Sequence, residues 1–239
     1  EGARMAEDAG ADVIDLNLGC PSKRVTNGFA GSALMRVPDQ ALALIEATVA
    51  ATSQPVTVKM RLGWDEDSLN APMIARRAQD AGARMITVHA RTRQQFYKGE
   101  ARWHLVRAVR EAVSVPLVVN GDITDTARAK TALAESGADA VMIGRGAQGQ
   151  PWLVGQIGDA LAGRPVRPAP RGTDLLELML AHYEDMLGEY GIELGVRVAR
   201  KHLGWYLDAA GLGGPADRKA LLTQDDPAKV TAALPALFD

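Results

Sequence analysis

Residues 116–145 read PLVVNGDITDTARAKTALAESGADAVMIGR, and the fold class follows from this segment. Two short apolar runs, Pro116–Asp122 and Ala138–Arg145, flank a segment with helical spacing at Asp125–Glu135. Short runs rich in valine and isoleucine are typical of strands that are buried on both faces. A strand, a helix and a second strand in this order predict a βα unit on a parallel sheet.

The same alternation extends upstream to the start of the chain, where residues 4–9 also have helical spacing. Further strands are predicted at Ala11–Asn17, Pro55–Arg61 and Arg84–Arg91, and further helices at Asp39–Thr52, Ala71–Asp80 and Trp103–Val113. The tetrapeptides AGAD, AGAR and SGAD precede three of the strands. Glycine is common at a helix C-terminus because it adopts the left-handed conformation without a Cβ clash. These three similar joints indicate one repeated unit.

Polar and glycine residues gather where the predicted strands end. They are Asn17, Gly19, Cys20, Lys59, Arg61, His89, Arg91, Asn120, Gly121, Asp122, Gly144 and Arg145. In a closed βα barrel the carboxyl ends of all strands form the active face. A doubly wound sheet binds ligands mainly at one switch point. Polar residues at all five ends therefore favour the barrel.

The glycine-bearing loops follow the last two predicted strands, and barrels often bind phosphate after strands seven and eight. We therefore expect a TIM-type (β/α)8 barrel, incomplete at the N-terminus, with strands four to eight present in residues 1–163. A proline-rich linker is predicted at residues 164–172, followed by a small all-α domain at residues 173–239. Its helices are predicted at Thr173–Tyr190, Leu194–Ala210 and Gln224–Phe238.

Composition limits the class of protein. The chain is 47% hydrophobic and 23% charged, with a net charge of −2. These values fit a globular protein and give no general support for nucleic-acid binding, so RNA would have to bind a local patch. The one cysteine excludes an intramolecular disulfide and fits a reducing compartment. No apolar run is long enough to predict a membrane span.

Three strand-end side chains are candidates for chemistry, and each has a plain alternative. Cys20 is either a small buried apolar residue or a general acid, since an ordinary thiol is mostly protonated at neutral pH. Lys59 either reaches solvent at its strand end or contacts an electron-rich ligand, and Arg61 projects beside it. His89 is either structural or functional. The metal-ligand spacings HxH and HExxH do not occur, so we expect no metal site.

Two further features indicate anion binding. The loops NGD and GRGAQG, the second before a helical segment, fit a phosphate site built from backbone N–H groups, with Arg145 adding a charge. In the helical domain Arg197, Arg200 and Lys201 share one helix face beside His202. That face is either a solvated surface or an RNA contact. Residues 173–239 hold eleven acidic and six basic residues, so only this local stripe could bind RNA.

These segments resemble the tRNA-dihydrouridine synthases, most closely the bacterial branch once associated with nitrogen regulation. The matching segments follow one another in the family's order over nearly the whole chain. They are NLGCP (Asn17–Pro21), GSALM (Gly31–Met35), VKMRLGW (Val58–Trp64), VHARTR (Val88–Arg93), NGDI (Asn120–Ile123), MIGRGAQGQPW (Met142–Trp152) and RKHLGWYL (Arg200–Leu207).

The resemblance implies a cytoplasmic, FMN- and NADPH-dependent oxidoreductase that reduces the C5–C6 double bond of a tRNA D-loop uridine, with no stable protein partner predicted. It implies that Cys20 is the acid that protonates C5. It implies flavin contacts from Lys59, His89, Asn120, Gly121, Asp122, Gly144 and Arg145. It implies substrate contacts from Asn17, Arg61, Arg91, Arg200, Lys201 and His202. The family's first strand has no counterpart here, so we expect this segment alone to bind FMN poorly.

Other functions fit parts of the pattern. A different FMN-dependent barrel oxidoreductase acting on a small molecule would share the phosphate loops but would not need the helical domain. A phosphate-binding barrel without flavin fits less of the chain. A non-catalytic tRNA-binding factor would bind RNA and would not depend on Cys20.

Overall fold

The computed structural model describes residues 1–238. The chain forms two compact units, Glu1–Gly144 and Arg145–Asp239. The first contains all five strands and the second is helical. Among residues 1–238, no helix combines the length and the apolar character that a membrane crossing requires.

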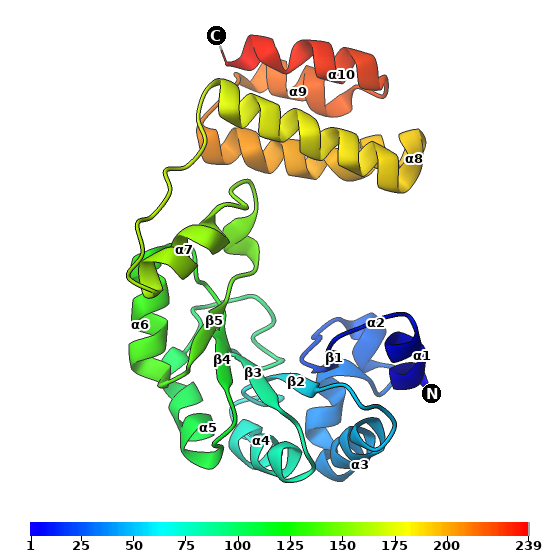
Figure 1. Ribbon diagram of the computed structural model, residues 1–239, viewed down its shortest axis with the longest axis vertical. Helices are drawn as coiled ribbons and strands as arrows, with labels where there is room; N and C mark the ends of the chain where they lie inside the picture. Colours follow the sequence, from blue (N-terminus) through cyan, green and yellow to red (C-terminus); the bar gives the residue numbers. More distant parts are fainter. Residues whose placement is uncertain (239) are drawn as a thin grey trace. The chain divides into compact units, whose positions relative to one another are not determined.

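The first unit is built on one parallel sheet whose five strands are hydrogen-bonded in sequence order, as Figure 1 shows. The strands are β1 (Ile14–Leu18), β2 (Val56–Arg61), β3 (Met85–His89), β4 (Leu117–Asn120) and β5 (Ala140–Met142). Each lies at a predicted apolar run, so the prediction of a parallel α/β sheet is confirmed. Parallel neighbours need a crossover connection, and helical segments supply it between every pair of strands.

The sheet has one polar and one apolar face. The register pairs Asn17 with Lys59, Arg61 with His89, and His89 with Asn120. Side chains alternate between the faces of a strand, so these five residues share one face. The opposite face carries the apolar residues Leu18, Val58, Met60, Ile86, Val88, Leu117 and Val119, all buried. The sheet therefore presents these five predicted site residues on the face opposite its apolar core.

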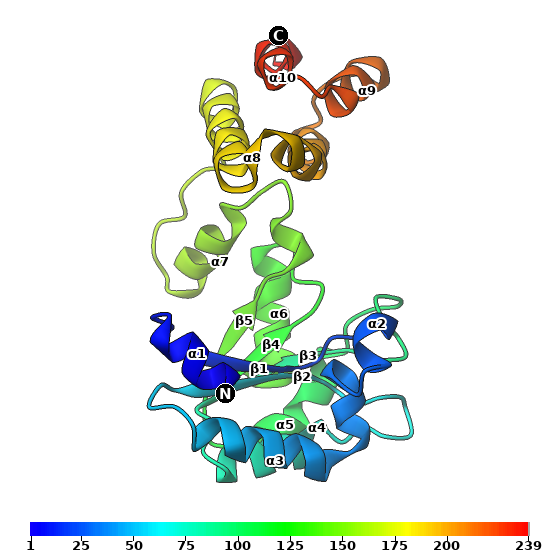
Figure 2. The same ribbon diagram turned by 90° about the vertical axis from the view of Figure 1, so that its right-hand side faces the viewer.

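Helices pack on the apolar face and continue the predicted alternation (Figure 1). They are α3 (Pro38–Val49), α4 (Ala71–Asp80), α5 (Arg107–Ala112) and α6 (Thr126–Ser136). The predicted helix at Trp103–Val113 begins instead as a 3-10 turn, η2 (Trp103–Val106), before α5. Helix α1 (Gly2–Asp8) precedes β1, and α2 (Lys23–Thr26) and the 3-10 helix η1 (Gly31–Arg36) follow it (Figure 2).

The repeated helix-to-strand joints have the predicted conformation. Gly10, Gly82 and Gly137 have φ angles of 91°, 106° and 68°. A residue with a Cβ adopts positive φ at a cost, so glycine suits each joint. The three tetrapeptides therefore mark equivalent positions of one repeated unit.

The second unit contains four α-helices among its described residues. They are α7 (Leu153–Leu161), α8 (Thr173–Ala210), α9 (Pro215–Thr223) and α10 (Pro227–Ala233), with short 3-10 helices η3 (Arg145–Ala147) and η4 (Pro235–Leu237). Residues 164–171, in the predicted linker, form no helix or strand. Helix α8 changes direction at Gly191, whose φ and ψ of 72° and 167° are not helical. It therefore consists of the two predicted helices, which pack around buried Met179, Ala199 and Leu203.

The end of the chain differs from the predicted helices in two places. No helix was predicted at α9, whose GGP start is typical of a turn, although proline is well tolerated in the first turn of a helix. The helix predicted to begin at Gln224 begins at Pro227. The carboxylate of Asp226 caps it by accepting a hydrogen bond of 3.0 Å from the N–H of Ala228.

Gly149 allows a close backbone contact within the second unit. A Cβ at this position would lie 2.1 Å from the carbonyl oxygen of Trp205, and Gly149 has a φ of 73°. We expect Gly149→Ala to lower the free energy of unfolding by about 2–4 kcal/mol, through overpacking and backbone strain. Urea denaturation followed by circular dichroism measures this. Gly158→Ala in α7, with nothing within 4 Å of its added Cβ, is the control and should not destabilise the fold. Equal losses of unfolding free energy in the two variants would contradict the close contact between Gly149 and Trp205.

Candidate active site

The loop after β1 is held in a fixed shape around Cys20. The Oδ1 atom of Asn17 accepts hydrogen bonds from the N–H groups of Gly19 and Cys20, at 2.9 and 3.1 Å. The carbonyl oxygen of Cys20 accepts from the N–H of Ser32 at 3.0 Å and from its hydroxyl at 2.8 Å. A Cβ on Gly31 would lie 2.8 Å from the same carbonyl oxygen. The backbone of Cys20 is thus fixed on both sides, and its side chain is partly exposed.

Arg61 joins this loop to the loop after β3. Its Nε donates to the carbonyl of Gly19 at 2.9 Å, and its Nη1 donates to the carbonyls of Thr92 and Phe96 at 2.9 and 2.8 Å. The residue is 2% exposed. Burial is the main cause that lowers the pKa of Arg61 to about 10, so the guanidinium stays charged at neutral pH. Arg61 therefore fixes the position of the Cys20 loop.

Lys59 is a cation without an anionic partner on the polar face. Burial lowers the pKa of its ammonium, and the charge of Arg61 lowers it further, while Asp15 opposes the shift. Within residues 1–238, Lys59 makes no ion pair with a carboxylate. A half-buried ammonium of this kind is suited to an electron-rich or anionic ligand.

A chain of hydrogen bonds fixes the tautomer of His89. The side-chain amide of Asn120 donates to the carbonyl of Met142 at 2.8 Å, so its oxygen faces Nδ1 of His89, also at 2.8 Å. Nδ1 must therefore carry the proton. Nε2 is then the acceptor for the guanidinium of Arg91, at 3.3 Å. Burial first, and then the charge of Arg61, lower the pKa of His89 to about 4, so the ring is neutral at pH 7.

This histidine makes stability depend on pH. In the unfolded chain its pKa is about 6.5, so below that pH the unfolded state binds a proton that the folded state excludes. We expect the free energy of unfolding to fall by on the order of 2–3 kcal/mol between pH 6.5 and 4 through this group alone. Denaturation of wild type and His89→Gln across this range measures the difference. If the free energy of unfolding changes with pH in the same way in both proteins, His89 is not the group that causes this pH dependence.

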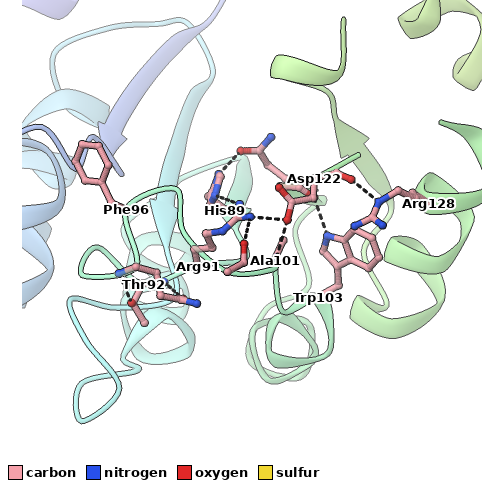
Figure 3. Close-up of polar contacts among 12 residues, drawn as sticks. His89, Arg91, Thr92, Phe96, Ala101, Trp103, Asp122 and Arg128 are labelled. Carbon is pink, nitrogen blue, oxygen red and sulfur yellow. Dashed lines mark hydrogen bonds and ion pairs between the residues drawn. The ribbon is translucent and has the colours of Figure 1, made fainter. Parts of the chain in front are cut away.

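Arg91 and Asp122 form an ion pair that connects the loops after β3 and β4 (Figure 3). Nη2 of Arg91 lies 2.5 Å from the carboxylate of Asp122 and 2.7 Å from the carbonyl oxygen of Gly99. The same carboxylate accepts the N–H of Ala101 at 2.8 Å. Burial acts to raise the pKa of Asp122, but the hydrogen bonds from Arg91 and Ala101 and the nearby positive charges lower it overall. Arg91 is 2% exposed, so it is enclosed by this network.

The loop after β4 is also held through its carbonyl groups (Figure 3). The indole N–H of Trp103 donates to the carbonyl of Gly121 at 2.8 Å, and Nε of Arg128 donates to that of Asp122 at 2.7 Å. The guanidinium of Arg128 also lies 5.0 Å from the Trp103 ring centroid. Gly121 and Asp122 have positive φ angles of 124° and 53°. The strained turn therefore depends on side chains from two other segments.

The sequence of the whole chain now identifies its family. The profile described as Dihydrouridine synthase (Dus) matches residues 1–226. The chain belongs to the dihydrouridine synthase family. This confirms the resemblance that begins at the Cys20 loop, and the geometry described above is that of a family member.

Similar proteins agree with this assignment. A protein of Rhodobacter capsulatus named probable tRNA-dihydrouridine synthase is 54% identical over 238 residues, covering 100% of this chain and 72% of that protein. The tRNA-dihydrouridine synthase B of Xanthomonas axonopodis pv. citri is 48% identical over 206 residues, 86% of this chain and 62% of that protein. The crystal structure of 2,3-dimethylmalate lyase shares the fold alone, with a TM-score of 0.51 at 19% identity over 68% of this chain and 59% of the lyase.

The predicted site residues of this Dus chain fall into two groups. The structure brings Asn17, Lys59, Arg61, His89 and Asn120 together on the polar face, with Cys20, Arg91, Gly121 and Asp122 in the loops at its carboxyl edge. Gly144 ends the first unit, and a Cβ there would meet nothing within 4 Å. Arg145 begins the second unit and is exposed.

The remaining predicted residues lie on α8 in the second unit. Arg200 forms an ion pair with Asp225, and the ammonium of Lys201 lies 5.8 Å from the Trp205 ring centroid. The ring of His202 lies 5.0 Å from Trp205. Burial, followed by the charges of His182 and Lys201, lowers the pKa of His202. Lys201 and His202 thus share an aromatic neighbour, Trp205, whereas Arg200 is directed to Asp225.

Sequence reasoning missed the residues that hold the site in place. Ser32, Trp103 and Arg128 lie 12, 18 and 6 positions from the residues whose carbonyls they contact, and no spacing rule indicates such contacts. Tyr97 was also missed. It is 49% exposed, and the guanidinium of Arg61 lies 5.8 Å from its ring centroid. Of these, only Ser32 lies in a segment that carries the family resemblance, GSALM.

Proposed function

We propose that this protein reduces the C5–C6 double bond of a uridine in the tRNA D-loop to dihydrouridine, with bound FMN and with NADPH as reductant, in the cytoplasm. The observation that carries the proposal is the position of Cys20. It is fixed at a strand's carboxyl end beside a polar face bearing Lys59 and His89, in a chain that matches the dihydrouridine synthase family over residues 1–226. The similar proteins named as tRNA-dihydrouridine synthases support the substrate.

We further propose that the sheet is part of a (β/α)8 barrel, of which it forms strands four to eight. Its five strands are parallel and in sequence order, as consecutive barrel strands are. Edge strands β1 and β5 each pair with one neighbour among the described residues, and exposed backbone edges are normally covered in native proteins. The polar face would then line the barrel interior. The predicted division into residues 1–163, 164–172 and 173–239 remains part of this proposal.

The polar face fits a flavin by its donor set. Lys59 is a half-buried cation without a carboxylate partner, and neutral His89 lies beside it. The backbone at Gly121 runs so close to Ala101 that a Cβ would lie 2.9 Å from the Ala101 side chain. We propose that Lys59 and His89 contact the ring system, and that Asn120, Gly121, Asp122, Gly144 and Arg145 hold the phosphate, largely through backbone groups.

The reaction needs a hydride at C6 and a proton at C5 of uracil. Hydride chemistry at C6 would come from FMN held on the polar face, with NADPH as the source of the electrons. The Cys20 thiol donates the proton to C5, its S–H bond breaks as the C5–H bond forms, and the thiolate takes a proton back from solvent. The target base must leave its stack to reach this position.

The arginines have different parts in this scheme. The Nη2 group of Arg61 makes no hydrogen bond within the described residues, so its two N–H donors are suited to a uracil carbonyl, with Asn17 nearby. Arg91 is enclosed, and we propose that it acts on the site by holding His89 and Asp122. On the second unit, Arg200, Lys201 and His202 are proposed to contact tRNA.

Anaerobic stopped-flow spectroscopy tests the proposal with the full-length protein. NADPH should bleach the flavin absorbance, and unmodified tRNA added afterwards should restore it much faster than buffer does. Restoration by small-molecule acceptors alone would instead support a small-molecule flavin oxidoreductase. Binding of tRNA without any bleaching would support a non-catalytic RNA-binding factor.

A further inference from the structure

Two loops of the first unit carry a concentration of positive charge. Residues 20–37, after β1, contain Lys23, Arg24 and Arg36 and no acidic residue. Residues 90–99, after β3, contain Arg91, Arg93 and Lys98 and again no acidic residue. The whole chain has a net charge of −2. Positive charge is therefore concentrated in these two loops, whereas the loop after β2 carries Asp65, Glu66 and Asp67 and Glu100 follows the second loop. Such a local concentration is the pattern expected of an anionic partner.

These loops form one surface. The side chain of Trp64, in the loop after β2, lies near two guanidinium groups, with Arg36 at 4.9 Å and Arg93 at 4.6 Å from its ring centroid. Arg93 also donates to the hydroxyl of Thr26 in α2, at 3.4 Å. Three successive strand-end loops are thus joined by cation–π and hydrogen-bond contacts. We call Lys23, Arg24, Arg36, Arg93 and Lys98 the basic rim.

The basic rim lacks the acidic partners that arginines have elsewhere in the molecule. None of its five residues forms an ion pair with a carboxylate within residues 1–238. Arginines of the outer helices do so, as in Arg76–Asp80 and Arg110–Asp139. Lys23, Arg24, Arg36 and Lys98 are also exposed. The rim charges therefore remain available to an external anion.

Phe29 lies in the loop after β1, and its side chain does not pack into the core. It is 74% exposed and has a φ of 56°, an uncommon and costly conformation for a large side chain. An exposed aromatic ring beside several cations is the combination with which proteins bind single-stranded nucleic acid, the ring stacking on a base and the cations contacting phosphates.

We propose that the basic rim and Phe29 bind the tRNA strand that flanks the target uridine. The rim cations contact its phosphates, and Phe29 stacks on an unpaired base next to the one that is reduced. This inference rests on the proposed function, because it takes tRNA as the partner. It assigns RNA binding to the catalytic unit itself, in addition to the stripe on α8.

Fluorescence anisotropy with labelled, unmodified tRNA tests the rim without requiring turnover. The full-length double variant Lys23→Gln/Arg24→Gln is compared with Arg84→Gln/Lys130→Gln, which removes two exposed charges away from the rim. Loss of two contacts to single-stranded phosphates should make the slope of log affinity against log salt shallower by about 1.4. The control should keep the wild-type slope. Equal slopes of log affinity against log salt in the two double variants would contradict the proposed role of the basic rim.

The stacking role of Phe29 is tested by comparing an aliphatic with an aromatic substitution. Stacking is worth enough that Phe29→Leu should weaken tRNA binding about tenfold, whereas Phe29→Tyr should bind like wild type. Equal affinities for the leucine and tyrosine variants would overturn the stacking role, and an acidic protein partner would give that result. The two proposals can fail separately. If the wild-type protein binds tRNA with the expected salt dependence but forms no dihydrouridine, the proposed function is contradicted and the role of the basic rim is still supported.

Discussion

Cys20→Ala is expected to slow dihydrouridine formation by about 10²- to 10⁴-fold, the usual contribution of a positioned general acid. The reason is specific to C5, because adding a hydride at C6 leaves a carbanion-like centre that must take a proton. The backbone of Cys20 is held by Ser32 and, through Gly19, by Arg61, so alanine should leave the loop in place. Single-turnover rates with pre-reduced enzyme measure the chemical step directly.

The matched variant is Cys20→Ser, which keeps a side chain of similar size. A serine hydroxyl is a far weaker acid than a thiol, so this variant should be nearly as slow as alanine. Binding of tRNA should persist in both. Cys20 is the only cysteine in the sequence, and its alkylation by iodoacetamide, located by peptide mass spectrometry, should inactivate the wild type. Near-normal rates for either variant would remove Cys20 from the chemistry.

Asp122→Asn is expected to lower the free energy of unfolding by about 3 kcal/mol. Removing one partner of a buried ion pair leaves the other charge uncompensated, and Arg91 is 2% exposed. Asparagine tolerates the positive φ of residue 122, so backbone strain should not add to the loss. Urea denaturation at pH 7 measures the change.

Two control variants test whether the loss of stability comes from the unpaired charge of Arg91. Asp80→Asn breaks the exposed Arg76–Asp80 pair and should cost less than about 0.5 kcal/mol. The double variant Arg91→Met/Asp122→Asn should lose less than the sum of the two single losses, because neither charge is then left alone. Strictly additive losses would show that the pair does not act as a unit.

The sequence predicts the sheet and its functional edge because both depend on local patterns. Apolar runs such as Pro116–Asp122 indicate buried strands, and AGAR at residues 81–84 marks the end of a helix. Once the strands are parallel, their carboxyl ends must share one edge. Cys20, His89 and Asn120 could therefore be grouped without coordinates.

The roles of the arginines could not be predicted in the same way. Arg61 and Arg91 were predicted as substrate contacts at strand ends, and the structure adds that both are buried and bond to backbone carbonyls or to Asp122. These contacts join residues between 8 and 42 positions apart and depend on loop conformation. The contacts of Trp103 with Gly121 and of Arg128 with Asp122 depend on loop conformation in the same way. Helix α9 was missed because its GGP start resembles a turn.

The most direct measurement is the dihydrouridine content of unmodified tRNA after incubation with the full-length protein, FMN and NADPH, determined by mass spectrometry. The account predicts that a D-loop uridine gains two hydrogen atoms, that omitting NADPH abolishes the gain, and that Cys20→Ala greatly slows it. Unchanged tRNA in the presence of flavin-loaded protein and NADPH would contradict it.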